Sequence, residues 1–314
     1  MKVSAECGSN ERRCNMEARF ITPVVTAFDS NYNLDIEANQ RIWDFVIEGG
    51  IDGIIIMGST GEFFAMTMKQ RKELIAQASK HINHRVPLIV GTGCMRQEET
   101  IELTRYAKEH NVDGVIIVPP YYFALSQDSV EDYFDTIVGA VDIKIYLYNY
   151  PERTGYDLTP EMMLRLRRKH DNIVGCKDTV VDFSHTRRLI DTILPEFPDF
   201  EIYSGYDDNF SHNVLSGGSG VIGGLTNVAP EVGSAIVSAF RENDIYKISY
   251  YQIQIDLLAQ LFEFGVPFVP LVKQAMIMRG IAMQNVCTPP LKCPNMKQQE
   301  RILDILGKVS IRTI

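Results

Sequence analysis

A lysine stands where an apolar strand is expected to end. Lys177 lies in the run Asn172-Ile-Val-Gly-Cys-Lys-Asp-Thr179. Alternation along a strand puts Gly175, Lys177 and Thr179 on one face, so the lysine has small neighbours and room for a ligand. Burial favours the neutral amine of a lysine, and a neutral amine can attack a ketone to form a Schiff base. The alternative is a surface lysine whose ammonium stays in water.

A cluster of tyrosines ends the preceding predicted strand. Tyr148 lies in the run Ile145-Tyr-Leu-Tyr-Asn-Tyr-Pro151, and a phenol beside a Schiff base can pass protons to and from a carbinolamine hydroxyl. We expect Tyr146 and Tyr150 to be packing aromatics. Arg153 follows in the same loop, where it could bind a carboxylate through two parallel hydrogen bonds or be an ordinary exposed arginine.

Two further segments offer hydrogen-bonding groups for an anionic or polyhydroxylated ligand. The turn Gly58-Ser-Thr-Gly-Glu62 presents hydroxyls and backbone N–H groups that suit a carboxylate. It lacks the lysine that a phosphate-binding P-loop requires, and many strand-to-helix turns look similar. In Gly205-Tyr-Asp-Asp208, two carboxylates could accept hydrogen bonds from sugar hydroxyls. Alternatively, an aspartate there caps the helical segment that follows.

These segments follow a regular alternation of strands and helices. Short runs rich in Ile and Val alternate with segments of helical period, which predicts parallel βαβ units. Eight such units favour a closed (β/α)₈ barrel, and an open doubly wound sheet is the alternative. The predicted strands are Phe20–Val24, Asp52–Gly58, Val86–Gly93, Asp113–Pro120, Ile143–Pro151, Asn172–Thr179, Glu201–Asp207 and Gly220–Leu225. The polar residues described above lie at the carboxyl ends of these strands, where barrel enzymes have their active sites.

The alternation stops after the eighth predicted strand. From Glu231 onward the pattern predicts only helices, over Glu231–Arg241, Tyr246–Phe264, Pro270–Arg279 and Lys297–Leu306. We therefore predict an α/β TIM barrel over residues 18–230, a helical C-terminal extension over 231–314, and a flexible tail over 1–17.

The composition is that of a soluble globular enzyme. The 314 residues are 45% hydrophobic and 23% charged, with a formal net charge of -9. An acidic chain argues against nucleic acid and anionic membranes as main partners, and no apolar run is long enough to predict a membrane span. The six cysteines lack metal-site spacing. We expect reduced thiols and no metal in a cytoplasmic protein, with a bridge within Cys7/Cys14 or Cys287/Cys293 as the alternative.

Six motifs in a fixed order resemble one enzyme family. They are Thr22-Pro-Val-Val-Thr26, Gly58-Ser-Thr-Gly-Glu62, Pro120-Tyr-Tyr122, Tyr148-Asn-Tyr-Pro151, Gly175-Cys-Lys177 and Asn227-Val-Ala-Pro230. Together they resemble the dihydrodipicolinate synthase / N-acetylneuraminate lyase family of class I, pyruvate-dependent aldolases. The resemblance implies a (β/α)₈ barrel with C-terminal helices, a homotetramer built as a dimer of dimers, and no metal or organic cofactor.

The resemblance also implies a role for each matching residue. Lys177 would form the imine with pyruvate, and Tyr148 would carry protons. Ser59 and Thr60 would hold the pyruvate carboxylate and orient that tyrosine. Tyr122 would reach across the tight dimer interface.

Other positions bear on the second substrate, in which members of the family differ. We expect Gly58, Arg153, Thr179, Gly205, Asp207 and Asp208 to line the substrate site. Lys177-Asp-Thr179 and the two aspartates resemble 2-keto-3-deoxygluconate aldolases, whereas Arg153 resembles the arginine with which synthases bind aspartate semialdehyde. We predict reversible cleavage of a 2-keto-3-deoxy sugar acid to pyruvate and an aldehyde. The alternatives are dihydrodipicolinate synthase, N-acetylneuraminate lyase, a dehydratase, or a binding protein without catalysis on the same scaffold.

Overall fold

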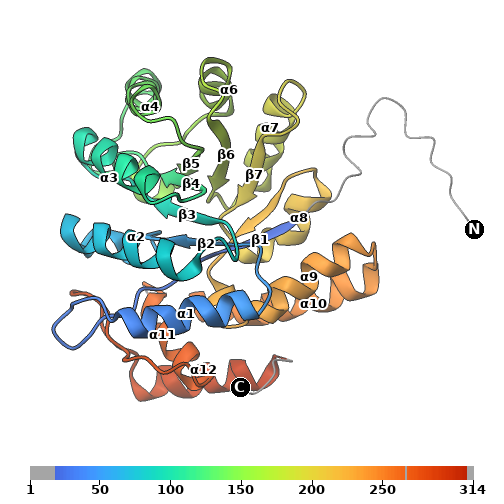
Figure 1. Cartoon of the computed structure of the whole chain (residues 1–314). Coiled ribbons are helices and arrows are strands. Elements are labelled where there is room, and N and C mark those ends of the chain that lie inside the picture. Colours follow the sequence, from blue (N-terminus) through green and yellow to red (C-terminus); the bar gives the residue numbers. More distant parts are fainter. Residues whose placement is uncertain (1–17, 266, 310–314) are drawn as a thin grey trace, which may run out of the picture.

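Eight parallel strands close into a barrel in a computed structural model that describes residues 18–265 and 267–309. The strands follow one another around the barrel in chain order, and β1 pairs with both β2 and β8 (Figure 1). The predicted barrel is therefore confirmed, and the open sheet is wrong. The strands are β1 Arg19–Pro23, β2 Gly53–Ile56, β3 Leu88–Gly91, β4 Gly114–Ile117, β5 Ile145–Asn149, β6 Ile173–Asp178, β7 Glu201–Ser204 and β8 Gly220–Ile222.

Helices surround the barrel and continue beyond it. Those within the first seven units are α1 Ile36–Glu48, α2 Met68–Ile82, α3 Gln97–Glu109, α4 Gln127–Ala140, α5 Pro151–Thr154, α6 Pro160–Lys169, α7 Phe183–Ile193 and α8 Phe210–Leu215, with 3₁₀ turns η2 Phe63–Ala65 and η3 Asp207–Asn209. After β8 come η4 Leu225–Asn227, α9 Pro230–Arg241, α10 Ile245–Ala259, η5 Gln260–Phe262, α11 Val269–Met278 and α12 Met296–Lys308.

Helix α9 packs as the helix of the eighth βα unit. Its Gly233 lies so close to Phe20 of β1 that an added Cβ would be 3.2 Å from the ring. Helices α10, α11 and α12 follow outside the ring of barrel helices (Figure 1). Helix α10 packs on α9, and α12 packs on α10 and α11. The helical extension is thus present, and the predicted division after residue 230 stays a prediction. The predicted tail over residues 1–17 lies outside the described residues.

Several strands end earlier than predicted, and each has a local cause. Strand β2 stops at Ile56 because Met57 has a left-handed backbone, with φ of 55°. Strand β5 stops at Asn149, and Pro151 then occupies the first turn of α5, where its missing N–H costs nothing. The residues expected to do chemistry therefore lie in turns and loops just beyond the strand ends, with Tyr148 and Lys177 still within strands.

The barrel interior is filled by side chains, as in other packed barrels. Isoleucines of β1 to β4 and of β8 form a cluster with Tyr146, Tyr148 and Tyr203. The phenols of Tyr146 and Tyr203 donate to Glu201 at 2.8 and 2.9 Å, and Arg19 pairs with the same carboxylate. This group closes the amino end of the barrel, so Tyr146 is a packing residue, as predicted.

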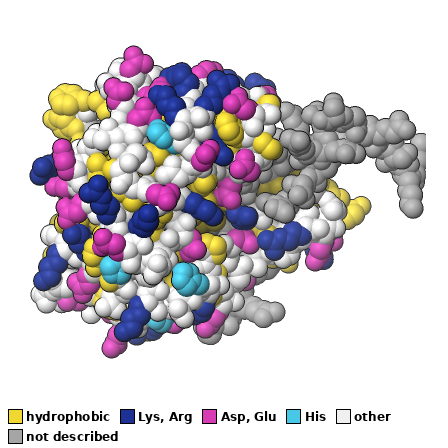
Figure 2. Space-filling view, turned by 45° about the horizontal axis from the view of Figure 1, so that its top comes forward, with side chains coloured by type: hydrophobic (Ala, Val, Ile, Leu, Met, Phe, Trp, Pro, Cys, Tyr) yellow, Lys and Arg dark blue, Asp and Glu magenta, His cyan; other side chains and the backbone are white. Residues whose placement is uncertain are grey.

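The surface charge, the helix lengths and the cysteines bear on the remaining expectations from the sequence. On the face seen in Figure 2, basic and acidic side chains are interspersed, and neither sign dominates. In the described part of the chain, no helix is long and apolar enough to cross a membrane. Cys287 and Cys293 are free thiols, so they form no bridge, whereas Cys7 and Cys14 lie outside the described residues.

Candidate active site

Lys177 and Tyr148 meet inside the carboxyl end of the barrel. They are directly paired residues of β6 and β5, and both side chains are buried. The Lys177 Nζ atom lies 4.7 Å from the centre of the Tyr148 ring. An amine that could attack a carbonyl is therefore next to a phenol that could carry the protons of that step.

The surroundings of Tyr148 favour its ionised form. Burial alone would raise the pKa of the phenol, but the positive charge of Lys177 and a hydrogen bond with Ser59 outweigh burial. Arg153 and Thr179 act in the same direction, and the pKa of Tyr148 is lower than usual. A phenol with a lowered pKa gives up its proton more readily at neutral pH.

The turn after β2 holds Ser59 and Thr60 between two left-handed residues. Met57 has φ of 55° and Glu62 has φ of 58°, conformations that side chains with a Cβ seldom adopt. Gly91 of β3 makes the turn possible, because a Cβ there would lie 2.1 Å from the Met57 carbonyl oxygen. The Ser59 hydroxyl thus faces Tyr148, and a small pocket lies beside these two residues.

Glu62 anchors this turn to the C-terminal extension. Its carboxylate forms an ion pair with Lys273 of α11, and both side chains are fully buried. The other carboxylate oxygen accepts two hydrogen bonds of 2.7 Å from the Thr288 N–H and hydroxyl. Lys273 also donates to the Val286 carbonyl at 2.7 Å. Sequence reasoning quoted Glu62 only as part of a motif, and no local pattern pointed to Lys273.

Gly205 leaves the space that the catalytic lysine needs. A Cβ at this position would lie 1.9 Å from the Thr179 hydroxyl and 3.0 Å from the Lys177 Cε atom. The Thr179 hydroxyl is buried beside the Tyr148 phenol and makes no well-formed hydrogen bond within the described residues. Both predicted residues therefore line the space around Lys177.

The two aspartates after β7 lie in different surroundings. Asp207 is buried, and its two oxygens accept hydrogen bonds from the Gly224 and Leu225 N–H groups at 3.1 and 2.9 Å. Asp207 thus joins the ends of β7 and β8, and burial raises its pKa to about 7. The Asp208 side chain is exposed, and its pKa is raised by partial burial and by Asp256 of α10. The predicted binding of polyol hydroxyls by Asp207 and Asp208 stays a prediction.

Arg153 and Tyr122 lie further from the lysine. The Arg153 guanidinium stacks over Tyr150 at 4.5 Å from the ring centre, at an exposed position from which its charge reaches Tyr148. Tyr122 is 80% exposed and stands edge to face with Phe123, which is 73% exposed. Within one chain Tyr122 is a surface residue, so its predicted part in the site would require a second subunit.

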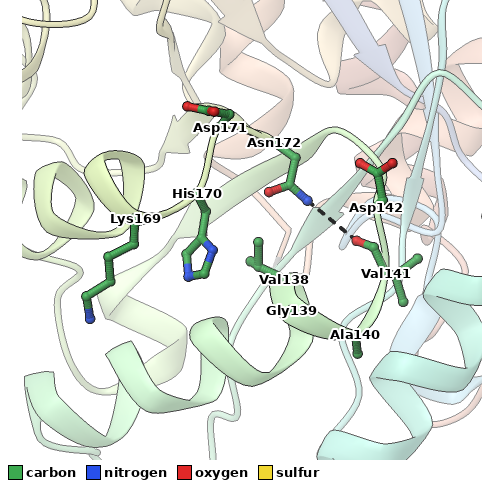
Figure 3. A pocket seen from close by; sticks show the side chains of 9 residues that line it. All are labelled: Val138, Gly139, Ala140, Val141, Asp142, Lys169, His170, Asp171 and Asn172. Atoms are coloured by element: carbon green, nitrogen blue, oxygen red, sulfur yellow. Dashed lines mark hydrogen bonds between the residues drawn. The ribbon is translucent and has the colours of Figure 1, made fainter.

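A larger hollow lies at the opposite end of the barrel and is not part of this site. It is formed where α4 and α6 lead into β5 and β6, and its lining includes Lys169, His170 and Asn172 (Figure 3). Lys169 and His170 both pair with Asp135. Both side chains therefore already have a polar partner. In residues 18–265 and 267–309, no three His, Cys, Asp or Glu side chains are grouped to hold a metal.

Comparison with known proteins agrees with this geometry. Residues 16–308 match the model of the dihydrodipicolinate synthetase family. The crystal structure of YagE from Escherichia coli, in complex with pyruvate, superposes with a TM-score of 0.92 at 32% identity and covers 94% of this chain and 99% of YagE.

Three curated relatives are similar in sequence. YjhH of Escherichia coli, provisionally named a 2-dehydro-3-deoxy-D-pentonate aldolase, is 35% identical over 86% of this chain and 90% of its own. YagE, provisionally named a 2-dehydro-3-deoxy-D-gluconate aldolase, is 34% identical over 86% of this chain and 89% of its own. A 4-hydroxy-tetrahydrodipicolinate synthase of Kosmotoga olearia is 36% identical over 76% of this chain and 81% of its own. The chain belongs to the dihydrodipicolinate synthetase family, a family of carbon–carbon lyases.

Proposed function

We propose that this chain is a class I aldolase that reversibly cleaves a 2-keto-3-deoxy sugar acid to pyruvate and an aldehyde, with Lys177 as the imine-forming residue. The observation that carries the proposal is the pairing of Lys177 and Tyr148 inside the barrel, with Nζ 4.7 Å from the ring centre. A buried amine beside a phenol with a lowered pKa has both functions that imine formation needs.

The first half of the reaction builds the imine. The substrate carboxylate binds at the turn of Ser59 and Thr60, which places the C2 ketone against Lys177. The neutral amine attacks C2, and the carbinolamine loses its hydroxyl as water. One proton passes from the nitrogen to the carbinolamine oxygen, and Tyr148 donates its own proton to the departing hydroxyl, which leaves an iminium beside the Tyr148 phenolate.

The second half breaks the carbon–carbon bond. The iminium withdraws the electron pair of the C3–C4 bond as the Tyr148 phenolate takes the proton of the C4 hydroxyl, so an aldehyde leaves and an enamine remains. Protonation of the enamine at C3 and hydrolysis by water then release pyruvate and restore Lys177. The iminium accepts and returns the electron pair, and the step needs no oxidant or organic cofactor.

Two observations favour the sugar-acid substrate. YjhH and YagE carry sugar-acid aldolase names, and each matches 86% of this chain. The Thr179 hydroxyl is buried beside Lys177 and the Tyr148 phenol, where it can donate to or accept from a substrate hydroxyl. The second candidate is dihydrodipicolinate synthase. The exposed Arg153 at the site and the 36% identity with the Kosmotoga synthase favour it.

A competition between substrates tests the proposal. We expect kcat/KM for cleavage of 2-keto-3-deoxygluconate or 2-keto-3-deoxypentonate to exceed that for condensation of pyruvate with aspartate semialdehyde by at least about 10-fold, which corresponds to about 1.4 kcal/mol. N-acetylneuraminate serves as a third substrate. A synthase reaction faster by the same margin would overturn the sugar-acid assignment and make Arg153 the deciding residue.

We also propose a cytoplasmic homotetramer built as a dimer of dimers. The exposed aromatic pair of Tyr122 and Phe123 supports this, because large exposed aromatic side chains are typical of subunit interfaces. Sedimentation of the purified chain tests it, with Tyr122→Ser as the variant and Tyr246→Ser, on the exposed side of α10, as the control. A monomeric wild-type chain with full activity would contradict the proposal.

A further inference from the structure

A ring of buried polar side chains lies directly behind the two proposed catalytic groups. Asn149 follows Tyr148 in β5, and Asp178 follows Lys177 in β6, and these two residues are paired across the strands. Because side chains alternate along a strand, Asn149 and Asp178 point out of the barrel where Tyr148 and Lys177 point in. Both outward side chains are fully buried.

His185 of α7 closes this ring. Its Nδ1 atom lies 2.9 Å from an Asp178 oxygen, and its Nε2 atom lies 3.0 Å from an Asp157 oxygen. Asn149 donates to the other oxygens of both aspartates, at 2.7 Å for Asp157 and 2.9 Å for Asp178. The side-chain oxygen Oδ1 of Asn149 accepts from the Leu158 N–H at 3.0 Å. The ring therefore joins β5, β6, α7 and the loop that follows α5.

The geometry favours a doubly protonated imidazole. An ionised carboxylate only accepts hydrogen bonds, so both ring nitrogens of His185 must donate. Asp178, from β6, and Asp157, from the loop before α6, face the ring. Arg188 lies in α7, and its charge acts on Asp157. Asp182 lies just before α7 and interacts with His185. Burial lowers the pKa of His185, but the hydrogen bonds and charges of the two aspartates raise it to about 9.

We infer that His185 is a positioning residue: as an imidazolium it holds together the strand ends that carry Tyr148 and Lys177 and the loop that follows α5, the short helix that carries Arg153. The inference rests on the proposed function, since these are its reacting groups. The backbone extends the same connection, because the Asn149 carbonyl accepts from the Thr179 N–H at 2.9 Å and the Asp178 carbonyl from the Gly205 N–H at 2.8 Å. Loss of the positive charge would leave Asp157 and Asp178 on either side of a neutral imidazole that can donate to only one of them.

The connection has a defined pH window. The folded-state pKa of His185 is about 9, against an ordinary value of 6.5. Its contribution to stability is therefore complete below about pH 6.5 and is lost as the pH rises through about 9. Over the same range the strand ends should lose their fixed spacing, and turnover should fall with them.

Two variants test the inference in the full-length protein. Glutamine is neutral, and its side chain can donate hydrogen bonds from one end only. Active sites are counted by trapping the imine with pyruvate and borohydride, and kcat per counted site should fall by at least about 10-fold in His185→Gln. The KM for the sugar acid should change by less than about 3-fold, because the carboxylate-binding turn after β2 lies outside the ring. Asp157→Asn removes one of the charges that keep His185 protonated, so the alkaline limb of the kcat profile should move to lower pH.

The control is His170→Gln, which breaks another His–Asp pair, 2.7 Å to Asp135, at the far end of the barrel. It should leave kcat and its pH profile unchanged. If His185→Gln keeps its kcat per trapped site within about 2-fold, or if Asp157→Asn leaves the alkaline limb in place, the inference is wrong. Should His185→Gln fail to fold, the Asp157→Asn profile decides alone. Absence of a trapped adduct in the wild-type protein would instead refute the proposed function.

Discussion

Glu62 and Lys273 are 211 positions apart in the chain and form an ion pair in which both side chains are fully buried. The glutamate ends the turn of Ser59 and Thr60, and the lysine belongs to α11 of the C-terminal extension. The left-handed backbone of Glu62 is therefore held by its side chain. The pair connects the proposed carboxylate-binding turn to helices outside the barrel.

The first prediction concerns this pair. Glu62→Gln should lower the free energy of unfolding by about 3–5 kcal/mol, because it leaves the Lys273 charge buried without its partner. The double variant Glu62→Gln/Lys273→Met should be more stable than Glu62→Gln, since no unpaired charge remains. Urea unfolding measures both. A single variant within about 1 kcal/mol of wild type would show that the pair does not hold the turn.

The second prediction concerns the covalent step. Incubation with pyruvate and borohydride should add one pyruvyl group irreversibly, and peptide mapping should place it on Lys177. Lys177→Ala should remain folded but lose nearly all turnover, because loss of the nucleophile acts on kcat. The exposed Lys144 supplies the control, and Lys144→Ala should trap pyruvate normally. An adduct on a different lysine would refute the mechanism.

The third prediction concerns the phenol of Tyr148. Tyr148→Phe keeps the ring beside Lys177 but removes the proton carrier, so kcat should fall by about 10²–10⁴-fold while slow imine trapping persists. Tyr250→Phe on α10 is the control. Equal turnover by Tyr148→Phe would assign proton transfer to another group.

The fourth prediction concerns cofactors. Because the iminium stores the electron pair, exhaustive chelation and dialysis should leave kcat unchanged. The measurement compares activity before and after treatment, and then after addition of Mg²⁺, Zn²⁺ or pyridoxal phosphate. A loss of activity that one of these additions restores would contradict the proposed chemistry.

The sequence by itself determined the barrel architecture and pointed to Lys177 and Tyr148 as the central pair of the candidate site. The alternation of short apolar strands with helical segments predicted the eight-stranded barrel, because period-2 and period-3.6 patterns reflect burial on a strand or helix face. The same alternation placed Lys177 and Thr179 on one face, and the structure puts both in the space around Tyr148. Boundaries were less well predicted, since the left-handed Met57 that ends β2 has no sequence pattern of its own.

Only the tertiary structure decided what each polar side chain contacts. Asp207 looked like a ligand for sugar hydroxyls, but backbone N–H groups 17 and 18 positions later take both of its oxygens. Glu62 and His185 likewise find partners from other elements. Strand alternation fixes the side of the sheet to which a residue points. Its hydrogen-bond partner depends on which distant backbone and side-chain groups the closed barrel brings within about 3 Å, and no local pattern carries that information.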